Sequence, residues 1–185
     1  MAPRTIMFLR HAEKPADHGA PHGVDQHGQP DDHCLSVRGW TRAGALAALM
    51  DHLPSADRPG MVRPARVMAT RPTDGYRSKR EHDTARPTAE RLGLDIDDAY
   101  AHDDTAAAAA SLLADDRDTL IVWHHGSIPE FIGHLPLAAG VSVPTAWPDD
   151  RFDLVWCLTA DGHGAYTFST ANQDLIAGDQ PASAT

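Results

Sequence analysis

Residues 5–15 read Thr-Ile-Met-Phe-Leu-Arg-His-Ala-Glu-Lys-Pro, an apolar run that ends abruptly in polar and charged side chains. A short, continuous apolar run is typical of a strand buried on both faces, as in a parallel sheet. The residues after Leu9 would then lie at the carboxyl end of that strand. This stretch predicts a core strand that delivers Arg10 and His11 to one edge of a sheet.

A second stretch repeats the pattern. Residues 119–123, Thr-Leu-Ile-Val-Trp, form the clearest strand, and His-His-Gly-Ser follows at 124–127. A helix is expected next, because Ile128, Phe131, Ile132 and Leu135 recur at helical spacing. Open sheets of parallel strands bind ligands at the carboxyl ends of their strands. The two histidine segments are therefore expected to meet at one edge.

The remaining chain alternates helices and strands. Apolar spacing predicts helices over 36–53, 80–92 and 104–115, although Pro87 suggests that the second helix starts near Arg86. A short strand is expected at 65–70, and a hairpin at 154–158 and 165–169 around Asp161-Gly162. Polar loops, rich in proline and glycine, separate these elements at 15–33, 54–64 and 136–151.

This order predicts an α/β fold: a three-layer sandwich with a mostly parallel central sheet and helices on both faces. The length of 185 residues fits one domain, which we place at residues 1–175, with a flexible tail at 176–185.

Composition excludes several classes of protein. The formal net charge is −10 without a basic run, which argues against a nucleic-acid partner. No apolar stretch is long enough to span a membrane, and the first apolar run is too short for a signal peptide. Cys34 and Cys157 are expected to be free thiols, and a cytoplasmic location follows as the expectation.

The polar segments suit one kind of chemistry. A neutral histidine attacks phosphorus well and divides a transfer into two steps through a phosphohistidine. Arginine forks match the phosphoryl oxygens, and a further group must protonate the leaving oxygen. Arg10 beside His11, Arg80 at a helix start and His125 after a strand supply most of these parts.

Four segments together resemble the histidine phosphatase superfamily, which contains the phosphoglycerate mutases and acid phosphatases. The segments, in chain order, are Leu-Arg-His-Ala-Glu-Lys-Pro at 9–15, Leu-Ser-Val-Arg-Gly-Trp-Thr-Arg-Ala at 35–43, Ser-Lys-Arg-Glu-His-Asp-Thr at 78–84 and Trp-His-His-Gly-Ser-Ile-Pro at 123–129. Each is weak alone, but their order is specific. The resemblance implies a phosphoglycerate mutase-like fold.

The resemblance also implies roles. His11 would be the phosphorylated nucleophile, Arg10 and Arg80 would clamp the phosphate, and His125 would bond a phosphoryl oxygen. Arg77, three residues before Arg80, is its rival for the clamp. Further contacts to substrate are expected from Lys14, His124 and Ser127.

His124 stands where glutamate often precedes the second histidine of this branch, so either His124 or His125 could be the pocket histidine. Alternation along the strand predicts that the two point in opposite directions. The general acid is left unassigned, and its candidates are Glu13, His124, Asp97, Asp98, Asp103 and Asp104. No cofactor is expected. A metal in the histidine-rich loop 15–33 is an alternative that its irregular spacing disfavours.

The sequence thus predicts a phosphatase that hydrolyses a phosphate monoester through a phosphohistidine at His11. Its substrate would be a small phosphorylated metabolite or a phosphoprotein side chain, and neither a nucleic acid nor a membrane is expected as partner. The alternatives are a phosphoglycerate mutase-like phosphotransferase and a catalytically weak phosphate-binding regulatory module.

Overall fold

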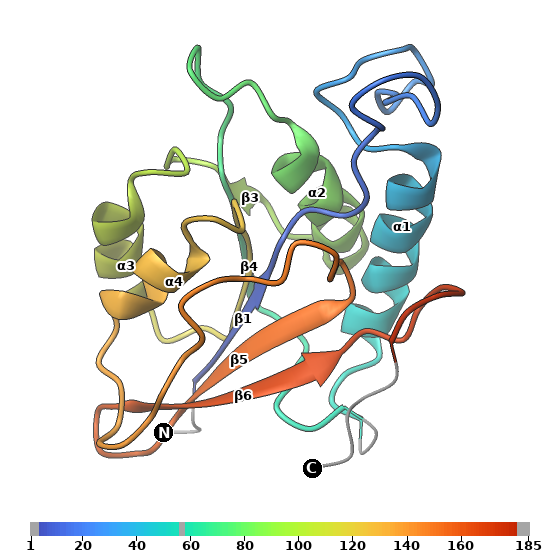
Figure 1. Cartoon of the computed structure of the whole chain (residues 1–185). Coiled ribbons are helices and arrows are strands. Elements are labelled where there is room, and N and C mark those ends of the chain that lie inside the picture. Colours follow the sequence, from blue (N-terminus) through green and yellow to red (C-terminus); the bar gives the residue numbers. More distant parts are fainter. Residues whose placement is uncertain (1–3, 56–57, 181–185) are drawn as a thin grey trace.

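A six-stranded sheet runs through the centre of the computed structural model, which describes residues 4–55 and 58–180 (Figure 1). The spatial order of the strands is β3-β2-β4-β1-β5-β6. Their bounds are β1 Thr5–Leu9, β2 Arg66–Ala69, β3 Ile96–Asp97, β4 Thr119–Val122, β5 Leu154–Ala160 and β6 Tyr166–Asn172.

Strand direction divides the sheet into two parts. The pairs β3-β2, β2-β4 and β4-β1 are parallel, whereas β5 pairs antiparallel with both β1 and β6. The expected α/β sandwich with a mostly parallel sheet and a terminal hairpin is therefore confirmed. The short strand β3 escaped prediction because two residues carry no periodicity.

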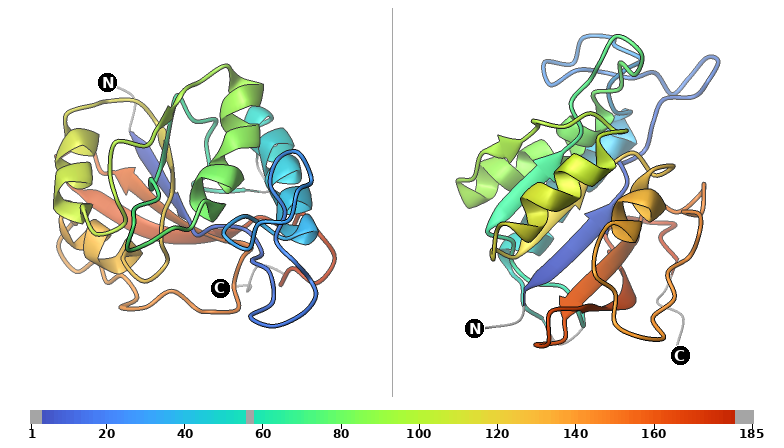
Figure 2. Two further views of the ribbon diagram at one scale, coloured as in Figure 1. Left: turned by 90° about the horizontal axis from the view of Figure 1, so that it is seen from above. Right: turned by 90° about the vertical axis from the view of Figure 1, so that its left-hand side faces the viewer.

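Helices cover both faces of the sheet (Figure 2). The helices are α1 Val37–Asp51, α2 Arg80–Leu92, α3 Thr105–Leu113 and α4 Ile128–Gly133. Helices α1 and α2 lie on one face, and α3 and α4 lie on the other. No helix in residues 4–55 or 58–180 is long and apolar enough to cross a membrane.

The two-sided cover explains why β1 reads as a continuous apolar run. Met7 and Leu9 pack in the core with α1 and α2, whereas Ile6 and Phe8 pack with α3 and α4. All four side chains are at most 1% exposed. Because neither face of β1 meets water, alternation of polar and apolar residues would leave polar groups buried without partners.

Helix α2 differs from one expectation. It begins at Arg80 and contains Pro87 in its interior, so the alternative start near Arg86 is wrong. Proline removes one backbone donor from a helix, at a cost of about 3 kcal/mol. Here Ala85 and Ala89, which flank Pro87, are buried against the sheet and α1. Tertiary packing thus stabilises α2 as a continuous helix, although Pro87 disfavours helix formation locally.

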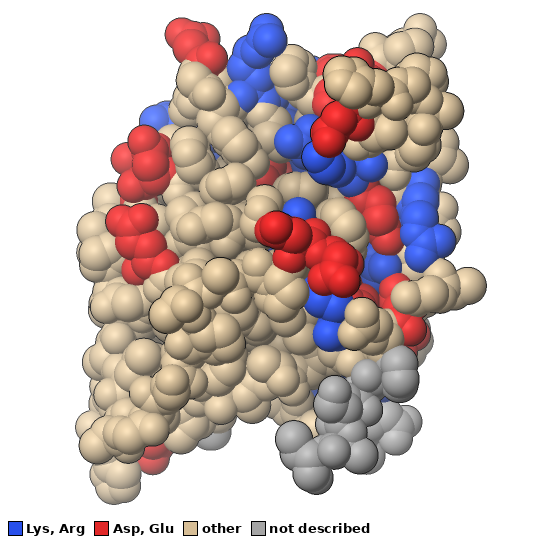
Figure 3. Space-filling view, in the orientation of Figure 1, with Lys and Arg blue, Asp and Glu red and all other residues tan. Residues whose placement is uncertain are grey.

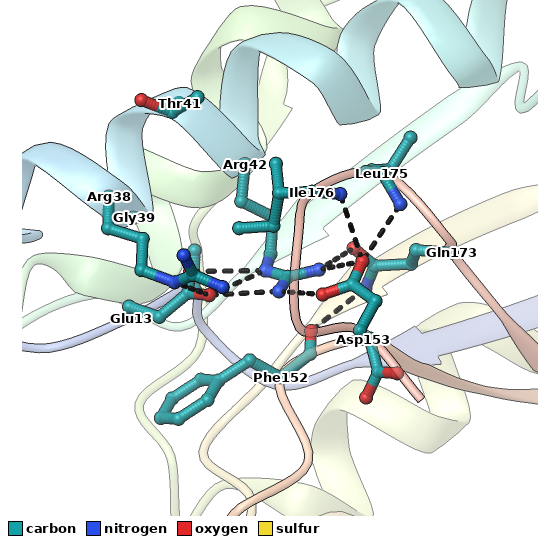
Figure 4. Close-up of polar contacts among 12 residues, drawn as sticks. Glu13, Arg38, Gly39, Thr41, Arg42, Phe152, Asp153, Gln173, Leu175 and Ile176 are labelled. Atoms are coloured by element: carbon teal, nitrogen blue, oxygen red, sulfur yellow. Dashed lines mark hydrogen bonds and ion pairs between the residues drawn. The ribbon is translucent and has the colours of Figure 1, made fainter. Parts of the chain in front are cut away.

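The segment after β6 is held by a buried arginine. Figure 4 shows the Arg42 guanidinium between Glu13 and the segment that follows β6. Its Nη2 atom lies 2.8 Å from Glu13 Oε1 and 2.6 Å from Asp179 Oδ1, and the Arg42 side chain is 4% exposed. Within the segment 176–180, assigned above to the flexible tail, Asp179 thus contacts the domain, and the boundary at 175 stays a prediction. Residues 181–185 lie outside the described residues.

Replacing Arg42 by methionine is expected to destabilise the fold by about 3–5 kcal/mol, because Asp179 would stay buried without its cation and Glu13 would keep only the exposed Arg38. The matched control is Arg63→Met. Arg63 lies 3.4 Å from Asp51 in a pair whose arginine is half exposed, and its loss should cost less than about 1 kcal/mol. Urea denaturation measures both. Equal losses for the two variants would contradict this account of the Arg42 network.

Candidate active site

The two histidine segments begin at the same level of the sheet. Leu9 pairs with Val122 in the parallel ladder, and the amide of Trp123 donates to the Leu9 carbonyl at 2.9 Å. Both chains then leave the sheet at its carboxyl edge. The rings of His11 and His125 consequently approach each other, with centroids 6.1 Å apart.

His11 is buried, and its ring is oriented by a hydrogen bond to the backbone of the next residue. Its Nδ1 atom lies 2.7 Å from the Ala12 carbonyl oxygen, so Nδ1 carries the proton and donates. The Ala12 amide in turn donates to Thr84 Oγ1 at 2.8 Å, and that hydroxyl donates to the Arg80 carbonyl at 2.7 Å. This tautomer leaves the Nε2 lone pair free for attack. Thr84 thereby joins the His11 segment to the first turn of α2.

Burial lowers the pKa of His11 to about 4, and repulsion from Arg10 and Arg80 acts in the same direction. The buried carboxylate of Glu81 and the Ala12 carbonyl oppose this shift without overcoming it. His11 is therefore neutral at pH 7, which is the state that a nucleophile requires.

The rate of any reaction that uses His11 as nucleophile should stay constant on the acid side down to about pH 5. It should then fall about tenfold per pH unit below a pKa of about 4, because protonation removes the Nε2 lone pair. A pH profile of kcat/KM with an activated aryl phosphate measures this. An acid limb near pH 6.5, the value of an unperturbed histidine, would contradict it.

Arg10 follows β1 and is 4% exposed. Its guanidinium carbon lies 4.2 Å from the centroid of the Phe152 ring, and its Nη1 donates to the carbonyl of Asp149. Its Nε has no hydrogen-bond partner among the described residues, although it is buried. An unpaired buried donor is costly, and an anion at this point would satisfy it.

Arg80 is the first residue of α2 and shows the same feature. Its Nη1 donates to the Asp32 carbonyl at 3.3 Å, while its buried Nε lacks a partner in the described part of the chain. Arg77, the rival candidate, is exposed. The structure thus brings Arg80 to His11, whose pKa it lowers, and leaves Arg77 at the surface. We call His11, Arg10, Arg80 and His125 the His11 cluster.

The expected opposite orientation of His124 and His125 is wrong, because their rings lie side by side with centroids 4.9 Å apart. Strand β4 ends at Val122, and residues 125–127 form a turn in which the Ser127 amide donates to the His124 carbonyl at 3.0 Å. Alternation of side chains holds only in extended backbone.

His125 faces His11 and has a buried Nδ1 without a partner among the described residues. Its pKa is lowered to about 4 by burial and by repulsion from Arg10 and His124. His125 is thus neutral at pH 7 and suited to hydrogen bonding an oxygen. The side chain of Asp149 lies 3.7 Å from His125 Nε2 and is 96% exposed.

His124 takes part in a different network. Its Nδ1 lies 2.9 Å from the hydroxyl of Tyr76, which donates to Glu81 Oε1 at 2.7 Å. The Ser78 hydroxyl donates to the other Glu81 oxygen at 2.8 Å. Glu81 is fully buried, and burial raises its pKa. His11 and the two hydroxyl donors outweigh burial, so the net shift is downward.

Two further residues that were expected to contact the substrate, Lys14 and Ser127, are bound to other groups. Lys14 is exposed and pairs with Asp17 at 2.7 Å, and the Ser127 hydroxyl donates to the His102 carbonyl at 2.8 Å. The structure leaves Lys14 on the loop surface and uses Ser127 to hold the segment before α3. Neither side chain joins the His11 cluster.

The carboxylates considered as acids have partners of their own. Glu13 is bound by Arg42 and Arg38, and Asp97 pairs with Arg66. Asp98 and Asp103 each lie 3.9 Å from a neighbouring histidine, and Asp104 accepts from the Ala101 amide at the start of α3. None of the five makes a contact with the His11 cluster. In residues 4–55 and 58–180, no three side chains of the metal-binding types converge.

The second sequence motif has a structural role. Ser36 caps α1 by accepting from the Gly39 amide at 3.2 Å, and its hydroxyl also lies 3.0 Å from the Glu13 carbonyl. A Cβ atom at Gly39 would lie 2.4 Å from that carbonyl, so only glycine permits this approach. The motif therefore packs α1 against the segment that carries His11.

Charged side chains gather around this edge of the molecule. On the face drawn in Figure 3, lysine and arginine side chains lie mostly in the upper right part, with acidic groups between them. The lower left part is mostly uncharged. Both signs of charge are thus mixed on this face, in a chain whose formal net charge is −10.

No protein-family model matches the chain, and no curated protein sequence is detectably similar to it. Several solved structures are similar to the structure of this chain. The protein histidine phosphatase SixA in complex with tungstate aligns over 91% of this chain and 97% of its own, with a TM-score of 0.52 and 16% identity. A protein described as mycobacterial hydrolase 1 aligns over 92% and 98%, with a TM-score of 0.53 and 16% identity.

A third structure is that of a mycobacterial glucosyl-3-phosphoglycerate phosphatase with bound vanadate. It aligns over 90% of this chain and 97% of its own, with a TM-score of 0.50 and 16% identity. At this identity the comparison establishes the architecture, and residue roles rest on the geometry described above. This chain therefore shares the fold of these three solved structures.

Proposed function

We propose that the protein is a phosphatase of the histidine phosphatase superfamily, which hydrolyses a phosphate monoester through a phosphohistidine at His11. One observation carries the proposal: a buried, neutral His11 with a free Nε2 lies beside two arginines whose buried Nε atoms lack partners among the described residues. That combination suits a nucleophile next to an anion site.

Substrate binding would satisfy the unpaired donors. A phosphoryl group placed before His11 Nε2 would accept hydrogen bonds from Arg10 Nε and Arg80 Nε, and from His125. The two permanent positive charges would offset the negative charge of the phosphate. They would also stabilise charge on the equatorial oxygens during transfer.

The reaction would proceed in two in-line steps. The Nε2 lone pair of His11 attacks phosphorus, the bond to the leaving oxygen breaks, and that oxygen takes a proton. Water then attacks the phosphohistidine and releases inorganic phosphate. The Ala12 carbonyl supports both steps, because it holds Nδ1–H and stabilises the positive charge that develops on the ring.

The substrate class follows from what the site can recognise. The proposed contacts would hold a phosphoryl group and leave the alcohol side unspecified, which suits a small phosphorylated metabolite or an exposed phosphoprotein side chain. The similar structures include one named as a protein histidine phosphatase and one named as a glucosyl-3-phosphoglycerate phosphatase. We place the protein in this range of phosphatases.

The test measures phosphate release from para-nitrophenyl phosphate and from a panel of phosphorylated sugars and phosphoglycerates. We expect inorganic phosphate and free alcohol in equal amounts. Isomerised phosphosugar or phosphoglycerate with little free phosphate would instead identify a mutase. Saturable phosphate binding without turnover would identify a regulatory phosphate-binding module. Either result would overturn the proposal.

A further inference from the structure

A general acid is the part that the His11 cluster does not supply, and the candidate carboxylates are engaged elsewhere. We propose that His124 is the acid that protonates the leaving oxygen, and that Tyr76 and Glu81 position it. This inference rests on the proposed phosphatase function and extends it by one catalytic residue.

The hydrogen-bond chain fixes which nitrogen of His124 is available. Tyr76 has one hydroxyl proton, which it donates to Glu81 Oε1 at 2.7 Å. Its oxygen must therefore accept from His124 Nδ1, 2.9 Å away. Nδ1 thus carries a proton in either charge state of the ring, and the second proton of an imidazolium resides on Nε2.

The other ring nitrogen of His124, Nε2, is the one that this hydrogen-bond chain leaves available. It makes no hydrogen bond to any described residue and is not enclosed, since it is absent from the buried atoms that lack partners. It lies against the backbone of Gly126, where a Cβ atom would come within 2.9 Å of it. Glycine at 126 therefore makes room for a histidine that keeps one nitrogen open.

The position of His124 suits a residue that protonates the leaving group. Its ring neighbours that of His125 at 4.9 Å, and His125 neighbours His11 at 6.1 Å. An in-line attack directs the leaving oxygen away from His11 Nε2, toward groups on the outer side of the bound phosphoryl. His124 lies in the same turn as His125 and is half-buried.

The groups around His124 shift its pKa in opposite directions. Burial lowers its pKa, and His102, Arg10 and Arg80 act the same way, whereas Glu81 raises it. His125 and Tyr76 are its other titratable neighbours. The Glu81 carboxylate opposes the lowering without overcoming it, so the His124 imidazolium forms only below the usual pH range of histidine. The alkaline limb that His124 causes should therefore lie below pH 6.5.

The proposed step balances as follows. His11 Nε2 forms a bond to phosphorus while the bond from phosphorus to the leaving oxygen breaks, and that oxygen takes the proton from His124 Nε2. His124 becomes neutral. It then accepts a proton from the water that attacks the phosphohistidine, which restores the imidazolium and frees phosphate and His11.

The test compares leaving groups in wild type and His124→Ala. An alkyl phosphate, such as glycerol phosphate, needs its leaving oxygen protonated, whereas dinitrophenyl phosphate leaves without help. We expect kcat/KM to fall roughly 10²–10³-fold for the alkyl phosphate and less than about tenfold for the aryl phosphate. Equal losses on both substrates would overturn the assignment, because a structural or phosphate-binding role does not depend on the leaving group.

Two further variants sharpen the result. Tyr76→Phe keeps the ring and removes the hydroxyl, so it should show a smaller loss that is again confined to the alkyl phosphate. It should also shift the alkaline limb of the pH profile, which should be absent in His124→Ala. Asp149→Asn tests the exposed carboxylate that lies 3.7 Å from His125 Nε2, and a loss confined to alkyl phosphates in that variant would transfer the role to Asp149.

Failure of this inference is distinguishable from failure of the proposed function. If dinitrophenyl phosphate is hydrolysed by wild type and by His124→Ala but not by His11→Ala, the phosphatase stands, whatever the alkyl phosphate shows. If wild type hydrolyses neither substrate, the proposed function fails, and this inference fails with it.

Discussion

Replacing His11 by alanine is expected to lower phosphatase turnover by about 10⁴-fold or more, to the background rate. The loss is this large because the nucleophile takes part in both steps, and removing a nucleophile eliminates the covalent route altogether. The measurement is release of phosphate from para-nitrophenyl phosphate at several enzyme concentrations.

The control separates chemistry from folding. His11 is 3% exposed, so His11→Ala leaves a cavity and some loss of stability is expected. His11→Asn retains a polar group of intermediate size, and circular dichroism should show a native fold. His27→Ala, an exposed histidine of loop 15–33, should retain wild-type turnover. Residual activity in both His11 variants above one-tenth of wild type would exclude His11 as nucleophile.

Replacing Arg80 by methionine is expected to lower kcat/KM by about 10²–10³-fold, the loss typical of removing one donor that stabilises charge in the transition state. Arg80 Nε is buried without a partner among the described residues, and the side chain donates to the Asp32 carbonyl through Nη1. The fold should therefore tolerate the change. Inhibition by vanadate should weaken in parallel, since the same donors would bind it.

Arg77→Met is the matched control, because it removes the same charge three residues earlier from an exposed side chain. It should change kcat/KM by less than about threefold. Arg80→Lys tests geometry, since lysine keeps the charge without the planar fork and should recover little of the activity. Similar losses for the Arg77 and Arg80 variants would indicate a general effect of net charge and contradict a specific clamp.

The elements that the sequence predicted well are those with a strong local signal. Strands β1 and β4 read as apolar runs because both faces are covered, and their ends carry the polar residues that meet at one edge. Arg80 and Thr84, four residues apart on α2, share a helix face, and that spacing links Arg80 to the His11 segment. These features depend on neighbours in the chain.

The predictions that were wrong depend on tertiary structure. Alternation failed at His124 and His125 because β4 ends at Val122, one residue before the expected end of the strand. The helix start near Arg86 failed because burial of the α2 face outweighs the local cost of Pro87.

The residues that the sequence did not reveal reach the site from irregular segments. Phe152 and the Asp149 carbonyl cover Arg10 from the loop before β5, where no periodicity marks them. Tyr76 lies in an irregular stretch before α2, and Glu81 was read only as part of a motif. A buried carboxylate beside two hydroxyl donors is visible only when the three groups are placed in space.

The most direct test of the central claim is to trap the covalent intermediate. The wild-type protein is mixed with a ³²P-labelled phosphate monoester, quenched in alkali during turnover, digested and mapped by mass spectrometry. We predict a phosphoryl group on His11 that is stable in alkali and labile in acid, present in wild type and absent in His11→Ala. Turnover without label on the protein, or label on another residue, would contradict the assignment of His11 as nucleophile.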